Sequence, residues 1–125
     1  MTPLLFAGAA VAGGVGAALR FLLDGLVKAH TSGRFPYGTA LINLSGSLVL
    51  GVLTGLAGSD WLPPEVATLI GVGLLGGYTT FSTASYETVR LAQERRSRAA
   101  LVNGLGMLVA CTLVALLGVW IGTLL

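Results

Sequence analysis

Charged residues are scarce in this chain. Only 10% of its 125 residues are Asp, Glu, Lys or Arg, whereas about a quarter of an ordinary soluble domain is charged. Four stretches hold no charged residue at all, at 2–19, 35–59, 66–86 and 99–125. A helix that crosses the hydrocarbon core needs about 20 mainly apolar residues. Four such helices account for nearly the whole chain, so a soluble domain is excluded.

Residues that carry catalytic or redox chemistry are also few. Cys111 is the only cysteine and His30 the only histidine, so neither a disulfide framework nor a Cys-based zinc site can be built. We expect a buried Cys111 and a solvated His30 in a loop. No Ser/His/Asp set or carboxylate pair lies at membrane depth, which argues against an enzyme. The one dense basic cluster, residues 94–98, lies between two apolar stretches, so it indicates membrane topology rather than nucleic-acid binding.

The pattern predicts an all-α membrane protein with a single four-span transmembrane domain over residues 1–125. We place the spans at about 3–26, 37–56, 65–91 and 99–122. The third span carries glycines followed by poor helix formers, which predicts a helix break near 76–80. At membrane depth such breaks are tolerated where the backbone faces protein or a cavity, and the freed carbonyls tend to coordinate a cation. The alternative is a straight helix whose small residues serve packing.

Polar side chains are rare within the spans, and their spacing is informative. Thr39, Asn43 and Ser47 recur every four residues and so form a polar line on one helix face. An amide in the bilayer is costly unless it has a hydrogen-bond partner. Asn43 is therefore either a functional residue or a residue that forms an interhelical hydrogen bond. Arg20 and Asp24 are four residues apart, and we expect them to neutralise each other or reach toward the interface. Four helices are too few to enclose a pore, which favours an oligomeric channel or transporter.

Three strings carry a resemblance to a known family. They are GGVGAALR at 13–20, GTALINLSG at 38–46, and GGYTTFST at 76–83 with Glu87 following. In order and spacing they resemble the fluoride channel family, Fluc or CrcB. The resemblance implies an antiparallel dimer with two narrow pores in the cell (plasma) membrane, which passively exports fluoride and relieves its cytoplasmic toxicity.

The resemblance also implies roles for particular residues. Asn43 would be a pore donor and Phe81 a pore aromatic, and the backbone carbonyls of Gly76 and Thr79 would form half of a structural sodium site on the dimer axis. Fluoride is small and strongly hydrated, so a selective pore must replace its water with hydrogen-bond donors. An aromatic ring can approach an anion with its positive edge. The hydroxyls that could supply further donors are those of Thr39, Ser47 and Ser82.

Two features depart from a symmetric channel. Ala84 stands where the family pattern usually has a second pore phenylalanine. All seven Lys and Arg residues belong to the first and third loops or their flanks, and the second loop has none. The positive-inside rule then places the basic loops in the cytoplasm and both termini outside. An antiparallel dimer cannot form from one chain fixed in one orientation, so we favour a heterodimer with an oppositely oriented homologue over a homodimer.

Two other functions remain as alternatives. One is a non-conducting accessory or scaffold subunit, which the missing phenylalanine favours. The other is a small dual-topology multidrug or cation exporter. An exporter would want a carboxylate at the membrane centre, whereas Asp24 and Glu87 lie toward span ends.

Overall fold

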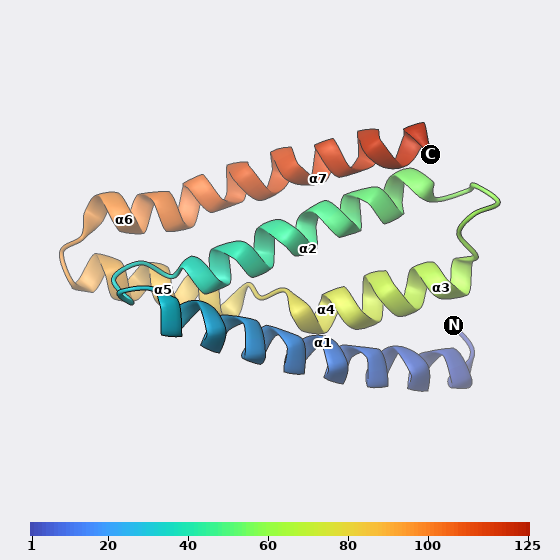
Figure 1. Cartoon of the computed structure of the whole chain (residues 1–125), viewed down its shortest axis with the longest axis horizontal. Coiled ribbons are helices and arrows are strands. Elements are labelled where there is room, and N and C mark those ends of the chain that lie inside the picture. Colours follow the sequence, from blue (N-terminus) through green and yellow to red (C-terminus); the bar gives the residue numbers. More distant parts are fainter.

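The computed structural model describes residues 1–125 and contains only helices (Figure 1). Four helical segments are long and apolar enough to cross a membrane, which confirms the predicted all-α, four-span fold. The first two are the continuous helices α1 (Pro3–His30) and α2 (Tyr37–Leu56). The third comprises α3 (Pro64–Thr68), the π-helical η1 (Leu69–Leu74), α4 (Leu75–Tyr78) and α5 (Ser82–Gln93); the fourth comprises α6 (Ser97–Leu101), the π-helical η2 (Val102–Gly106) and α7 (Met107–Leu124).

Local sequence signals set the helix ends. Thr2 caps α1 by accepting a hydrogen bond from the Leu5 N–H at 3.2 Å, and Pro64 starts α3 without the loss of a helical hydrogen bond. Helix α1 runs to His30, four residues past the expected boundary. His30 is therefore not the loop residue that we expected, because its ring Nδ1 contacts the Leu26 carbonyl at 2.9 Å within the last helical turn.

Glycines bring two pairs of helices into backbone contact. A Cβ placed on Gly51 of α2 would overlap the Ala115 carbonyl oxygen of α7, and one on Gly118 would overlap the Leu48 carbonyl oxygen. A Cβ on Gly77 of α4 would likewise overlap the Gly13 carbonyl oxygen of α1. Without a hydrophobic driving force between helices in lipid, such close contacts supply the van der Waals energy of packing.

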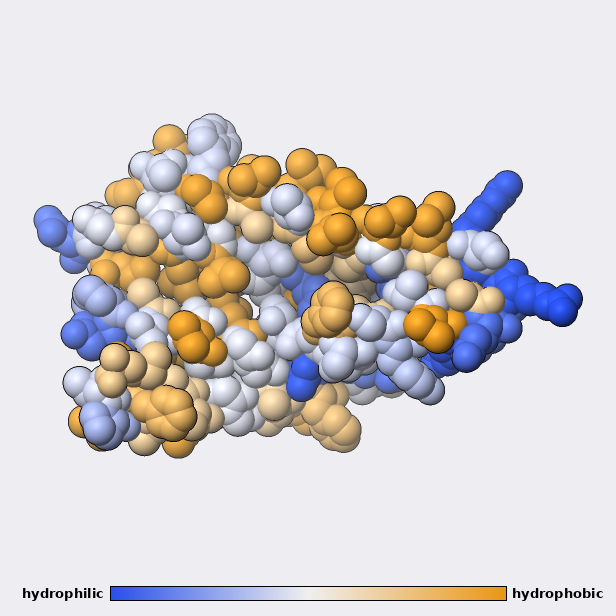
Figure 2. All heavy atoms as spheres, turned by 180° about the vertical axis from the view of Figure 1, so that it is seen from behind, coloured by the Kyte–Doolittle hydropathy of each residue, from blue (hydrophilic) through white to orange (hydrophobic).

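The outer surface is apolar along the helices and polar at the two ends. Figure 2 shows orange side chains over much of the long faces, and long hydrophilic side chains that project from one end. Only 18 of the 125 residues are buried within the chain, so lipid or another subunit must cover most of its apolar surface. Both termini lie together at the end opposite loops 31–36 and 94–96 (Figure 1).

The third span is interrupted as predicted. Helix α4 ends at Tyr78, Thr79 is extended with φ −79° and ψ 161°, and α5 resumes at Ser82. The break is visible as a stretch of plain coil between α4 and α5 in Figure 1. The π-helical turns η1 and η2 were not predicted from the sequence.

Candidate functional site

Both the nitrogen and the oxygen of the Asn43 side-chain amide form hydrogen bonds to the backbone at the helix break. Its Nδ2 donates to the Thr80 carbonyl at 2.8 Å, and its Oδ1 accepts from the Thr80 N–H at 2.9 Å. Asn43 is thus an interhelical hydrogen-bonding residue, one of the two readings left open by its position in α2. The amide nitrogen carries two hydrogens, so one donor remains beyond the bond to Thr80.

Arg20 also reaches the break, from α1. Its guanidinium donates to the Thr79 carbonyl at 3.1 Å. Of the two arrangements expected for Arg20 and Asp24, the mutual pair does not form: the Asp24 carboxylate instead pairs with Lys28 at 2.8 Å, one turn further along α1. A backbone carbonyl left free by the break offers Arg20 a partner that sequence spacing alone does not reveal.

The carbonyls of Gly76 and Thr79 fit half of a site for a hard cation. The Thr80 N–H, which in a continuous helix would donate to the Gly76 carbonyl, donates to Asn43 instead. Gly76 is exposed and has no atom within 4 Å of an added Cβ. A carbonyl oxygen has two lone pairs, so Thr79 can accept from Arg20 and still offer one to an ion. Carbonyl oxygen suits a hard cation, but two such ligands leave the shell incomplete without a second subunit.

An open groove of about 640 Å³ runs beside the break. It brings together five of the predicted site residues, namely Asn43, Ser47, Gly76, Thr79 and Phe81. The Phe81 side chain is 88% exposed, so no other part of this chain forms the opposite wall. From the fourth span, Asn103, Met107 and Cys111 line the same groove, and Cys111 is half-buried rather than buried as expected.

The other two predicted hydroxyls lie outside this groove. Thr39 lines a second cavity, of about 340 Å³, between α1, α2 and α5. The Ser82 hydroxyl lies beside the break, 3.4 Å from the Thr80 hydroxyl. The structure therefore divides the polar line of α2 between two cavities.

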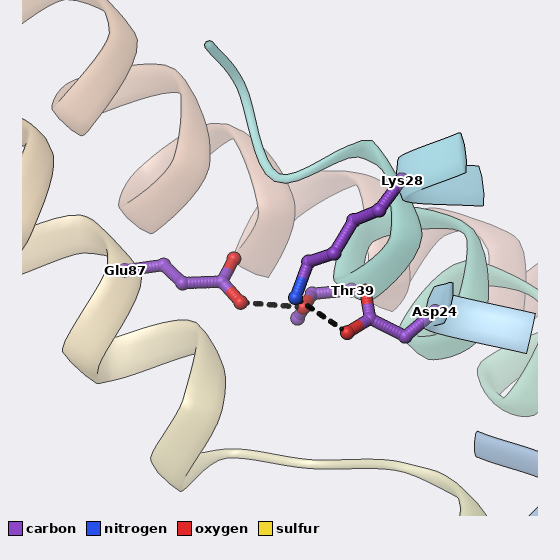
Figure 3. A network of polar contacts seen from close by, with 4 residues as sticks. All are labelled: Asp24, Lys28, Thr39 and Glu87. Atoms are coloured by element: carbon purple, nitrogen blue, oxygen red, sulfur yellow. Dashed lines mark hydrogen bonds and ion pairs between the residues drawn. The ribbon is translucent and has the colours of Figure 1, made fainter. Parts of the chain in front are cut away.

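Glu87 is a polar residue to which sequence reasoning gave no partner. It is only 6% exposed, and its Oε1 accepts a hydrogen bond from the Thr39 hydroxyl at 2.8 Å (Figure 3). Its Oε2 has no hydrogen-bond partner within the chain. The signal in the sequence is a carboxylate that ends the uncharged stretch 66–86 of the third span, because a charged side chain within a span by default marks a functional position.

Asn103 ties the fourth span to the third. Its Nδ2 donates to the Thr88 hydroxyl at 2.8 Å and lies 3.3 Å from the Ala84 carbonyl oxygen, and the residue is 2% exposed. In the structure it fixes η2 against α5, next to the groove.

The fold and the site define an integral membrane protein with an open groove beside an interrupted helix, where a few polar groups lie among apolar surface. This is the arrangement of an oligomeric channel or transporter subunit. Comparison with protein families identifies it further. The family model described as CrcB-like protein, Camphor Resistance (CrcB), matches residues 7–119, and the chain belongs to this family, as the three strings predicted.

Similar proteins cover almost the whole chain. The protein named fluoride-specific ion channel FluC 1 of Leifsonia xyli subsp. xyli is 52% identical over 124 residues, which are 99% of this chain and 90% of that protein. Fluoride-specific ion channel FluC 2 of Mycobacterium bovis is 43% identical over 121 residues, 97% of this chain and 93% of that protein. A FluC 1 of Symbiobacterium thermophilum is 46% identical over 107 residues, 80% of this chain and 86% of that protein.

Proposed function

We propose that this chain is a subunit of a fluoride channel that lets fluoride leave the cytoplasm passively. The observation that carries the proposal is the open groove, where the Asn43 amide and the Phe81 ring lie beside the helix break. Relatives of nearly the same length are named fluoride-specific ion channels.

The pore donors are the free amide hydrogen of Asn43 and nearby hydroxyls. Ser47 shares the groove with Asn43, Thr39 lies on the second cavity, and Ser82 lies at the break. Phe81 contributes the positive edge of its ring, which attracts an anion that its face would repel. Together these groups replace the water that fluoride loses on entering the membrane.

A second subunit, inserted antiparallel, completes the groove. The exposed Phe81 and the open side of the groove both favour a partner surface there. We favour a homologous but different chain, because all seven cations belong to the two loops at one end and their flanks and Ala84 replaces a pore phenylalanine. The numbered names of the relatives, FluC 1 and FluC 2, fit a channel made of two different chains.

A structural sodium ion would join the two subunits. The Gly76 and Thr79 carbonyls of this chain would hold it, and the partner would supply the remaining ligands. The ion would neutralise the carbonyl dipoles that the break turns toward the partner. It is a fixed component of the dimer and not a transported ion.

Orientation is tested by the sidedness of the C-terminus. The charge asymmetry places the basic loops in the cytoplasm and both termini outside. A C-terminal cysteine tag in a Cys111→Ser background should react with an impermeant reagent added to intact cells. A population labelled from both sides would contradict the fixed orientation and restore the homodimer.

The channel itself is tested in cells that lack their own fluoride exporter. Growth on fluoride should be rescued when this chain is expressed together with a homologue whose basic loops lie at the opposite end. It should not be rescued when the Asn43→Ala variant of this chain is expressed with the same homologue. A pair that inserts and assembles normally but gives no rescue would contradict the proposal and favour a non-conducting scaffold.

A further inference from the structure

The second cavity, at the basic end of the molecule, holds charges of both signs. It lies between α1, α2 and α5, and Arg20, Asp24 and Thr39 are among its lining residues. Arg20 also reaches the break, where its guanidinium donates to the Thr79 carbonyl. The cavity therefore connects the basic end of the protein with the site described above.

Two carboxylates stand beside this cavity and would repel an anion. Glu87 accepts from Thr39 at 2.8 Å. The Asp24 carboxylate lies against the first turn of α2, so close that a Cβ on Gly38 would overlap its Oδ1. Walls of low dielectric strengthen such repulsion relative to open water. An anion pathway that passes here needs a compensating positive charge near both carboxylates.

Lys28 supplies a positive charge near these two carboxylates. Its Nζ lies 2.8 Å from Asp24 Oδ2, and Figure 3 shows its side chain extended toward the hydrogen bond between Thr39 and Glu87. Asp24 and Lys28 both lie within electrostatic reach of the Glu87 carboxyl. Arg20, Asp24 and Lys28 are spaced four residues apart and so follow one face of α1 over about 12 Å.

We propose that Lys28 sets the rate at which fluoride enters from the basic end, by offsetting the negative charge of Asp24 and Glu87 beside the second cavity. Lys28 acts through its field and not as a fixed ligand, since its side chain is 64% exposed. The inference rests on the proposed channel function and adds a residue that determines its rate.

The test is fluoride efflux from liposomes that contain this chain and its partner, with a potassium ionophore to balance charge. Lys28→Gln should lower the initial rate several-fold at an ionic strength of about 0.01 M, where the screening length is about 30 Å. The deficit should nearly vanish in about 1 M impermeant salt, where that length is about 3 Å. Lys28→Arg should retain the rate, and the double variant Lys28→Gln with Asp24→Asn should recover it.

A matched control removes a different cation from the same end. Arg98 lies on α6 and, unlike Lys28, neither pairs with Asp24 nor acts on the Glu87 carboxyl, so Arg98→Gln should leave the rate within about twofold. The inference is overturned if Lys28→Gln conducts as the unmodified pair does at low ionic strength. It is also overturned if the deficit is equal at both salt concentrations and Asp24→Asn does not relieve it, since the role would then be structural. No efflux from the unmodified, folded pair would instead overturn the channel function itself.

Discussion

The pairing of Asn43 with Thr80 makes a direct prediction for the variant Asn43→Ala. The substitution removes two hydrogen bonds at once, of 2.8 and 2.9 Å, and leaves the Thr80 N–H and carbonyl without partners. Thr80 is only 8% exposed, so water cannot easily replace the amide. The break should lose its attachment to α2, and the fluoride flux should fall because a pore donor is lost as well.

The size of the effect follows from the two groups left unpaired. A buried backbone group without its partner costs about 1–3 kcal/mol, whereas interhelical hydrogen bonds in membranes average only about 0.6 kcal/mol each. For two bonds these values bracket a loss of about 1–6 kcal/mol, and we expect a loss near the lower end, about 2 kcal/mol. A change of that size lowers the equilibrium constant for folding about 30-fold.

The measurement is reversible unfolding of the detergent-solubilised protein, together with hydrogen exchange at the Thr80 amide. Thr54→Ala is a matched control, because the Thr54 hydroxyl bonds only to the Leu50 carbonyl one turn earlier in the same helix. Asn43→Ala should lower the free energy of unfolding far more than Thr54→Ala and accelerate exchange at Thr80. Equal unfolding free energies in the two variants, with unchanged exchange at Thr80, would refute the role assigned to Asn43.

Three further predictions concern packing, a helix end and the pore. Gly51→Ala should destabilise the protein by about 1–3 kcal/mol in the same unfolding assay, because its Cβ overlaps the Ala115 carbonyl, whereas Gly14→Ala, with open space around it, should not. Arg95 adopts φ 59° after the end of α5, so Arg95→Gly should raise stability by about 0.5–1 kcal/mol and increase the melting temperature; an unchanged or lower value would count against strain there. Phe81→Ile should reduce fluoride efflux while leaving the unfolding free energy nearly unchanged, because the ring is 88% exposed; normal efflux would remove Phe81 from the pore.

The sequence was sufficient for the features that depend on local composition. Gaps between charged residues predicted the four spans, because the bilayer requires long uncharged helices. Glycines followed by threonines predicted the break between α4 and α5, because these residues form helices poorly.

Contacts between distant segments were beyond such reasoning. Asp24 has a cation four residues away on either side, Arg20 and Lys28, and local spacing favours neither. The Thr79 carbonyl, 59 residues from Arg20, decides between the two cations because it accepts a hydrogen bond from the Arg20 guanidinium. Glu87 likewise accepts a hydrogen bond from Thr39, which lies 48 residues away in the sequence. The π-helical turns η1 and η2 insert a residue into a helix whose apolar pattern gives no sign of it.

The most direct test is fluoride efflux from liposomes that contain this chain, an oppositely oriented homologue, or both. A fluoride electrode and a chloride electrode would follow the two anions in the same sample. The proposed heterodimeric channel predicts rapid fluoride efflux from liposomes with both chains, little efflux with this chain alone, and no matching release of chloride. Absence of fluoride efflux from a well-folded dimer of the two chains would contradict it.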